Sequence, residues 1–488
     1  MNRRVELVSG TGLLLAFGIT VWISLASSPR ASAIPAFARK YQTSCTTCHN
    51  NYPELNDFGE AFKKNGFKFP KDDETFVKEP PVLLGAKAQK EVFPKAVYPG
   101  ELPGSLPLGF RYEGFAQYNS KVPLASGFVP RTDLFVPNTF TIIAAGSFGP
   151  TLSFWIDDDL STGGSGADGG LGDGYLKVND VGHYLHLPKD ALNVRFGQFE
   201  LDLPFTQART INLSDYDIYD QAGCVNNPDC AGTGAVAGTA ANSFILGAPQ
   251  RGIEVGGYPN DGNFTWSVAL VNGSNDSTAT RNFKDVYVRV SQRFNLERDA
   301  NARHEIQAAG PTGPRDHTSL RLGAFGYYGR NALNVGGSLF PGLGLPTIRE
   351  PFYRVGGDFR FKYRQFELWG LGMYGHDTNL LLNNSEDGFV PGAPVTFSGG
   401  FVETEYWFYP WLIGLMRYDV VNSPTDFLNG ISRNNTRNRF SPGVQLLVRS
   451  NIKLAFEYQR KFEQPVPDSI AAKFFRANGF AGGIDFVF

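Results

Sequence analysis

Residues Cys45, Cys48 and His49 form a C-x-x-C-H box near the amino terminus of the 488-residue chain. In this pattern two thiols bind the vinyl groups of a haem covalently, and the histidine that follows ligates the iron. The alternatives are a redox-active C-x-x-C followed by an unrelated histidine, and one half of a zinc site. No second cysteine pair or nearby histidine completes a zinc site. The box therefore predicts one covalent haem c per chain and an electron-transfer role.

The first residues predict export. Arg3 and Arg4 precede an apolar run over residues 13–25, and small residues follow at 31–33, so a signal peptide is expected over residues 1–33. The alternative is an uncleaved membrane anchor, but the run is shorter than the ~20 apolar residues that a transmembrane helix needs. Covalent attachment of haem takes place after export, so the position of the box agrees with its chemistry.

Residues 34–70 predict a small α-helical haem module. Asn50 or Asn51 is the expected helix N-cap, Pro53 lies in the expected first turn, and Gly66 is the expected end. The apolar face of this helix would cover the porphyrin or form an ordinary core, and it carries Leu55, Phe58 and Phe62. Residues 71–107 are rich in proline and predict an extended linker to the rest of the chain.

The composition of the remaining chain indicates many short strands. The sequence contains 56 Gly, 41 Phe and 20 Tyr, and after residue 33 it has no run of 18 apolar residues that would predict a transmembrane helix. The formal net charge of −2, with both signs interspersed, argues against nucleic acid as a partner.

Residues 108–488 predict a mainly β fold, an antiparallel transmembrane barrel of sixteen strands in the outer membrane. Segments of about ten residues with alternating polarity recur, and tight turns alternate with longer loops. An even strand number leaves both ends on the periplasmic side, from which the haem module would enter. The expected strands are 108–118, 139–147, 152–159, 175–186, 191–202, 250–258, 263–273, 283–294, 318–330, 351–362, 365–376, 398–408, 411–420, 438–449, 451–461 and 477–488.

The second axial ligand of the haem is not evident near the box, because residues 50–106 contain neither Met nor His. Strand parity ranks the distant candidates. Met373 is expected to face the lumen near the external end, and it is the candidate distal ligand. His183 is expected on a lumenal face near a periplasmic turn, His376 at a strand end, and Met416 on the lipid side.

Two further groups could carry chemistry. Cys224 and Cys230 lie six positions apart in a Gly- and Asn-rich stretch, where a loop-closing disulfide is expected and a redox or metal role is the alternative. The acidic run at residues 157–159 could attract Fe(II), and the alternatives are a solvated surface or a Ca²⁺ site.

Residues 34–67 resemble a known family. The run Ile34-Pro-Ala-Phe-Ala-Arg-Lys, the C-x-x-C-H box, Pro53-x-Leu55-x-x-Phe58-Gly59-x-x-Phe62-Lys63 and Gly66-Phe67 are similar to the amino-terminal segment of fused monohaem cytochrome–porins, which include outer-membrane iron oxidases. The resemblance implies thioether bonds from Cys45 and Cys48, and His49 as the proximal iron ligand. It also implies Fe(II):cytochrome c oxidoreductase activity, with extracellular Fe(II) as donor and a soluble periplasmic c-type cytochrome as acceptor.

Two other functions use the same parts. The barrel could conduct electrons outward to an extracellular acceptor, or it could be a diffusion porin in which the haem-bearing module is only a plug. The reduction potential of the haem distinguishes an outward electron conduit from an iron oxidase. Single-channel conductance identifies a diffusion porin.

Overall fold

The structure is a computed structural model. It describes residues 36–69, 73–79, 82–83, 89–95, 101–102, 104, 107–120, 131–149, 151–162, 171–206, 211–214, 216–220, 244, 246–259, 262–273, 283–296, 318–334, 347–378, 381–384, 388–391, 394–423, 435–462 and 478–488. The predicted signal peptide, Cys224 and Cys230 lie outside the described residues. Among the described residues, no helix is long and apolar enough to cross a bilayer.

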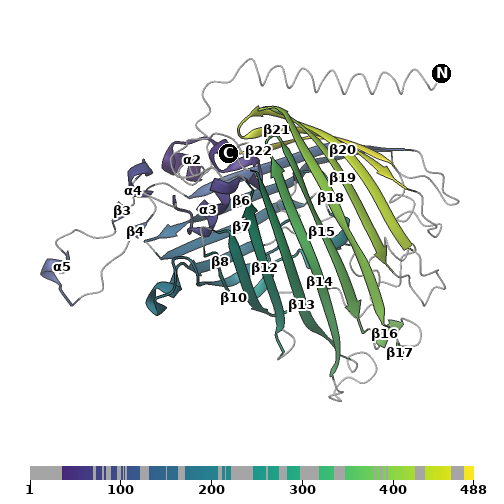
Figure 1. The fold of residues 1–488 in the computed structure, drawn as a ribbon, viewed down its shortest axis with the longest axis horizontal. Coiled ribbons are helices and arrows are strands. Elements are labelled where there is room, and N and C mark those ends of the chain that lie inside the picture. Colours follow the sequence, from purple (N-terminus) through teal and green to yellow (C-terminus); the bar gives the residue numbers. More distant parts are fainter. Residues whose placement is uncertain are drawn as a thin grey trace.

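Sixteen strands close into one antiparallel barrel, which confirms the predicted architecture (Figure 1). Neighbours in the ring are consecutive along the chain except that β15 pairs with β18 and the last strand, β22, pairs with β5. The barrel strands are β5 (Leu108–Asn119), β6 (Thr132–Phe148), β7 (Leu152–Thr162), β8 (Leu171–Val178), β9 (Asn193–Phe199), β10 (Gln250–Gly257), β11 (Phe264–Val271), β12 (Asp285–Asn295), β13 (Ser319–Asn334), β14 (Thr347–Tyr363), β15 (Phe366–Asp377), β18 (Val395–Tyr409), β19 (Leu412–Ser423), β20 (Asn435–Arg449), β21 (Ile452–Lys461) and β22 (Gly479–Val487).

The two faces of the barrel wall differ as the alternating sequence predicts. On β14, Tyr353 and Val355 are 36% and 45% exposed, whereas Arg354 and Asp358 are buried in the lumen at 1% and 7%. Successive side chains of a strand point to opposite faces, so on β14 the outer face is apolar and the lumenal face is polar. An apolar exterior around a polar interior is the arrangement of a membrane-spanning barrel.

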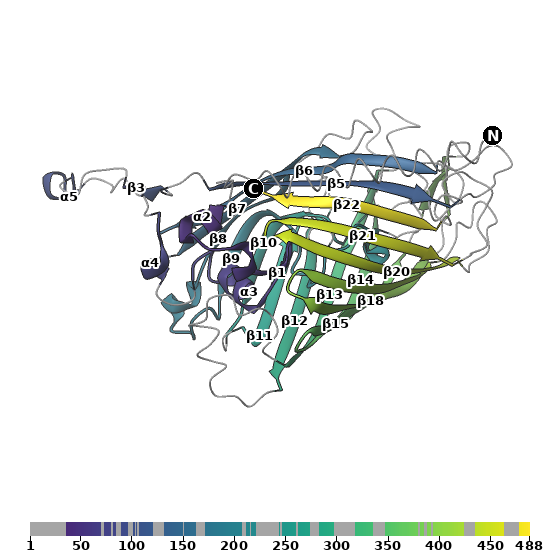
Figure 2. The ribbon, with the colours of Figure 1, turned by 90° about the horizontal axis from the view of Figure 1, so that it is seen from above.

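The small amino-terminal elements lie at the end of the barrel where the turns are tight (Figures 1 and 2). The carboxyl terminus is at the same end, where Phe488 pairs with Phe110 through two backbone hydrogen bonds. The elements are α2 (Ala36–Tyr41), the 3₁₀ helix η1 (Cys45–Thr47), β1 (His49–Asn51), β2 (Glu54–Leu55), α3 (Asp57–Lys64), α4 (Asp73–Phe76), β3 (Val82–Leu83), α5 (Gln89–Val92) and β4 (Glu101–Leu102). Residues 36–69 are called the module below.

The connection between β8 and β9 differs from the prediction. The expected strand 175–186 ends at Val178, and residues 181–185 form the 3₁₀ helix η2 (Val181–Leu185). Asp180 and His186 flank this helix with φ angles of 53° and 58°, and such left-handed residues interrupt an extended strand. His183 therefore lies on this helix rather than on a lumenal strand, and the prediction for it was wrong.

A hydrophobic core fills part of the barrel lumen. Residues after β9 turn inward, and they include the short helix α6 (Asp217–Asp220). Apolar side chains of this inserted segment pack against lumenal side chains of the wall such as Trp369, Phe401 and Leu415. The buried residues of the segment are Leu201, Leu203, Phe205, Ile211, Tyr216, Ile218, Tyr219, Phe244 and Leu246. Between β15 and β18 the chain forms a small hairpin of β16 (Leu381–Asn384) and β17 (Gly388–Pro391).

Candidate functional site

The C-x-x-C segment forms a single tight turn. Cys45 begins η1, and the backbone N–H of Cys48 donates to the carbonyl of Cys45. Both thiols are free and half-buried. Burial raises the pKa of both, and that of Cys48 reaches about 12. A redox-active C-x-x-C instead needs a lowered thiol pKa, so this environment does not suit the redox alternative.

His49 is oriented by the strand pair that follows the turn. Its Nδ1 lies 3.2 Å from the carbonyl oxygen of Glu54, and because a carbonyl only accepts, Nδ1 carries the proton. Burial lowers the pKa of His49 to about 4, so the imidazole is neutral at pH 7. Nε2 is then left with its lone pair, which is the arrangement of a histidine that ligates a metal.

These residues fit a covalent haem. The donor set consists of two protonated thiols within one turn and, directly after them, a neutral imidazole whose Nε2 is available. Thioether formation consumes two thiols, and axial ligation requires a neutral imidazole nitrogen.

The start of helix α3 packs against the C-x-x-C turn through Asn56 and Gly59. Asn56 caps the helix by accepting a hydrogen bond from Gly59 N at 2.8 Å, and its Nδ2 donates to the carbonyl of Thr47 at 3.1 Å. A Cβ at Gly59 would lie 2.0 Å from the carbonyl oxygen of Cys48, so only glycine allows this approach. The expected cap at Asn50 or Asn51 was wrong, because residues 49–55 form the β1–β2 hairpin first.

The apolar face of α3 packs within an aromatic cluster of the module. Phe62 is 4% exposed and packs edge-on against Tyr41 and Phe37, at ring centroid distances of 5.7 Å and 5.0 Å. Phe67 extends the cluster to Trp155 on β7, at 5.6 Å. The Glu60–Lys64 pair on the other side of the helix is present at 3.9 Å. The helix face therefore belongs to a core that anchors the module to the barrel wall.

Charged side chains dock the module against one side of the wall. Asp57 lies 3.4 Å from both Lys362 on β14 and Arg293 on β12. Burial would raise the pKa of Asp57, but these two cations outweigh it and hold the pKa below its ordinary value. Arg360 on β14 contacts Glu54, the residue whose carbonyl orients His49.

Other strands hold the module from different directions. Lys177 on β8 donates to the carbonyl of Lys64 at 2.8 Å, and Lys453 on β21 donates to the carbonyl of Tyr52 at 2.6 Å. Asn51 donates to Gln445 on β20. Contacts to strands around the ring, all near the tight turns, place the module in the mouth of the barrel like a plug.

A cavity of about 160 Å³ remains between α3 and the wall. Cationic side chains outnumber anionic ones around it. The cations are Lys63, Lys64, Lys177, Arg195, Arg289, Arg321 and Arg360, and the anions are Glu60, Asp202, Glu254 and Asp358.

The structure does not bring Met373 to the box. Met373 faces the lumen as predicted, buried at 4% in the core of the inserted segment. It follows Glu367 by six positions on β15, which is about 20 Å of strand, and Glu367 is the residue that lies beside the module. Its role as distal ligand stays a prediction.

The remaining candidates lie elsewhere. Met416 is 50% exposed on the outer face, as predicted. His376 stacks on the outward-facing Tyr353, with ring centroids 5.3 Å apart. Asp157 accepts hydrogen bonds from Trp155 Nε1 and Asp173 N, and within the described residues the run at 157–159 forms no cation-binding group.

Sequence reasoning missed two features of the site. The first is the inserted segment, whose Ser214 accepts from and donates to wall residues deep in the lumen. The second is a group of three carboxylates, Glu54, Glu367 and Glu405, that meet between the module and the wall. Neither has a local signal, since each joins positions far apart in the chain.

Comparison with protein-family models finds no match, and comparison with curated proteins finds none either. Solved structures that are similar include the anion-selective porin from Comamonas acidovorans, at 10% identity and a TM-score of 0.47, and the channel DcaP of Acinetobacter baumannii, at 14% and 0.46. OmpF of Salmonella typhi in complex with daunomycin is 12% identical with a TM-score of 0.45. Each likeness covers 78% of this chain and 96–98% of the other. The strand pairing of the chain itself establishes a closed, sixteen-stranded porin-like barrel.

Proposed function

We propose that this protein is an outer-membrane barrel that carries electrons across the membrane through one covalent haem c held by the module. The observation that carries the proposal is the position of the donor set. Cys45, Cys48 and a correctly oriented His49 lie in one turn and hairpin, and that hairpin is fixed in the mouth of a membrane barrel.

Each residue has a defined part in holding the group. Cys45 and Cys48 would form the thioethers, and His49 would ligate the iron through Nε2. The carbonyl of Glu54 holds the imidazole ring, and Asn56 and Gly59 hold the turn against α3. When bound, the haem supplies a one-electron carrier. Outer-sphere transfer then needs no acid or base from the protein.

The filled lumen favours passage of electrons over passage of solutes. The module occupies the turn end, the inserted segment packs within the barrel, and wall residues such as Glu403 and Arg417 are fully buried against the inserted segment. One haem cannot span an apolar band of ~25 Å by itself. We therefore place a soluble periplasmic c-type cytochrome at the turn end and the external redox partner at the loop end.

The direction of transfer follows from the resemblance of residues 34–67 to the fused cytochrome–porins. On that basis we propose extracellular Fe(II) as the electron donor, which makes the protein an Fe(II):cytochrome c oxidoreductase. Outward transfer to an extracellular acceptor uses the same structure with a lower haem potential.

Anaerobic spectroscopy of the purified, haem-loaded protein tests the proposal. Rapid reduction of the haem by Fe(II), together with a high midpoint potential, is the expected result. A matched variant, Cys45→Ser with Cys48→Ser, should form the barrel without covalent haem and show no Fe(II)-dependent spectral change. A low potential without reduction by Fe(II) would favour the outward conduit. A protein that takes up no haem but conducts ions in planar bilayers would be a diffusion porin.

A further inference from the structure

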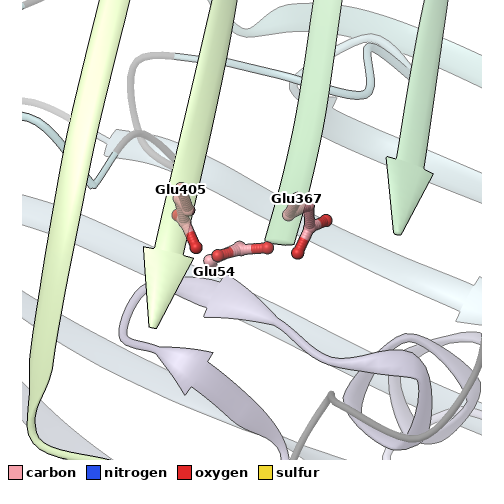
Figure 3. A group of neighbouring side chains, drawn as sticks. All are labelled: Glu54, Glu367 and Glu405. Atoms are coloured by element: carbon pink, nitrogen blue, oxygen red, sulfur yellow. The ribbon is translucent and has the colours of Figure 1, made fainter. Parts of the chain in front are cut away.

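Three carboxylates from distant parts of the chain meet where the module touches the barrel wall. Glu54 comes from β2 of the module, Glu367 from the start of β15 and Glu405 from the end of β18. One carboxylate oxygen of each lies within 4.8 Å of the other two. Figure 3 shows Glu54 between the other two side chains, with the carboxylate of Glu405 directed toward it.

The partners of these carboxylates leave two oxygens unused. Arg360 contacts Oε1 of both Glu54 and Glu367, and Asn50 donates to Glu54 Oε1 at 3.2 Å. Trp407 Nε1 donates to Glu405 Oε2 at 3.3 Å. Among the described residues, Glu54 Oε2 and Glu405 Oε1 have no hydrogen-bond partner, although both are buried and Glu405 has an exposure of 0%.

The local charges do not balance. Arg360 compensates one of the three negative charges. Lys362 lies 3.9 Å from Glu367, but it is also paired with Asp57 at 3.4 Å. At least one negative charge therefore remains, and an uncompensated buried charge is strongly unfavourable. A divalent cation bound to the two unused oxygens and to Glu367 would neutralise the three carboxylates together with Arg360.

We propose that Glu54, Glu367 and Glu405 form a binding site for one hard divalent cation that fastens the module to strands β15 and β18. Purely oxygen ligands suit Mg²⁺, Ca²⁺, Mn²⁺ or Fe²⁺ rather than a thiophilic metal. The site is distinct from the haem donors, but it shares Glu54 with them, because the carbonyl of that residue orients His49. It does not depend on the proposed direction of electron flow.

Mn²⁺ is the probe for the first experiment. The folded, haem-loaded protein is freed of metal with a chelator and titrated with Mn²⁺, and the unbound ion is followed by room-temperature EPR. One bound Mn²⁺ per chain is expected, and competition by Ca²⁺ and Mg²⁺ identifies the preferred cation. Absence of binding at millimolar Mn²⁺ would overturn the proposal and indicate that protons balance the cluster.

Substitution of the individual carboxylates tests whether the ion binds at this cluster. Glu405→Gln and Glu54→Gln should each weaken Mn²⁺ binding at least tenfold. The matched control is Glu403→Gln, because Glu403 lies on the same strand with the same 0% exposure but is bonded to Asn212 and Tyr216. Equal affinity in the double variant Glu54→Gln/Glu405→Gln would overturn the proposal. Heat-modifiable gel mobility verifies that each variant forms the barrel.

A measurement on the wild-type protein covers the case in which variants do not fold. Crystals soaked in Mn²⁺ should give an anomalous scattering peak between the three carboxylates. A peak elsewhere, or none, would contradict the assignment.

Discussion

Asn51 of the module donates a hydrogen bond to the side-chain oxygen of Gln445 on β20. The amide nitrogen of the same Gln445 donates to the carbonyl of Ile211 in the inserted segment. One buried glutamine, 1% exposed, thus links the hairpin that carries His49 to the segment that fills the lumen. The plug at the turn end and the core deeper in the barrel are in this way mechanically connected.

We expect Gln445→Ala to destabilise locally both the hairpin that contains Asn51 and the inserted segment that contains Ile211. The change leaves the Asn51 amide and the Ile211 carbonyl without their bonds, and an unsatisfied buried polar group costs about 1–3 kcal/mol. Hydrogen exchange measured by mass spectrometry should rise in residues 49–56 and 211–214 together. Gln117→Ala is the control, since among the described residues Gln117 forms a hydrogen bond of 3.1 Å to Asn119 of its own strand and none to the module or the inserted segment. Faster exchange in one region alone would contradict the link.

Gly59→Ala should disturb the C-x-x-C turn. The new Cβ would lie 2.0 Å from the Cys48 carbonyl oxygen, so α3 or the turn must move, and such overpacking costs about 1–3 kcal/mol. The yield of covalent haem, measured by the pyridine haemochrome spectrum, should fall. Gly372→Ala on the barrel exterior is the control, because nothing lies within 4 Å of a Cβ there. Equal haem yields in the two variants would mean that the close approach has no role.

Asp57 should make the docking of the module sensitive to acid. Its pKa in the folded protein lies below the ordinary value of 3.8, so its stabilisation is complete above pH 3.8 and is lost as the pH falls through the folded-state pKa. Asp57→Asn should lower the free energy of unfolding at pH 7 by about 1 kcal/mol and flatten the acid dependence. Urea unfolding midpoints between pH 2 and pH 7 measure both effects.

The control for Asp57 is Glu60→Gln. Glu60 lies on the same helix and pairs with Lys64 at 3.9 Å in an i,i+4 arrangement, and such pairs contribute ~0.2–0.5 kcal/mol. If Asp57→Asn retained the wild-type acid dependence, its ion pairs with Lys362 and Arg293 would not govern docking.

If the module keeps the position that it has in the structure when haem is bound, Met373→Leu should leave the haem absorption spectrum unchanged. Met373 lies about 20 Å along β15 from the residue that touches the module, and the swap conserves volume, so its cost in stability is below about 1.5 kcal/mol. His49→Ala, by contrast, should alter the spectrum by removing the proximal ligand. Loss of a sulfur-to-iron charge-transfer band in Met373→Leu would show that the module moves to reach this methionine when haem is bound.

The barrel could be predicted from sequence because its signals are local. Alternating polarity and tight turns such as the one after Tyr363 located all sixteen strands, with differences at the ends. The prediction failed at residues 179–192, where Asp180 adopts a left-handed conformation that no periodicity reveals. It also placed the start of α3 too early, because Asn56 has the capping role that Asn50 or Asn51 was expected to have.

The candidate site could be predicted only in part. The C-x-x-C-H box is a contiguous motif, so the sequence alone is enough to nominate its donors, and haem attachment there stays a prediction. Glu54 is more than three hundred positions from Glu367 and Glu405, and the three carboxylates meet only because the barrel closes around the module. The inserted segment was not predicted for the same reason. The sequence of a long connection between two strands does not show whether the connection lies outside the barrel or inside its lumen.

The docked module also sets an order of events during maturation. The Cys48 thiol is half-buried in a module that is held by strands as far apart in the chain as β8 and β21. Closure of the ring by β5 and β22 brings these strands around the module and so restricts the approach of an enzyme that joins haem to the thiols. On the proposed chemistry, the cofactor is attached while the chain is still in the periplasm, and the barrel then assembles around a finished cytochrome.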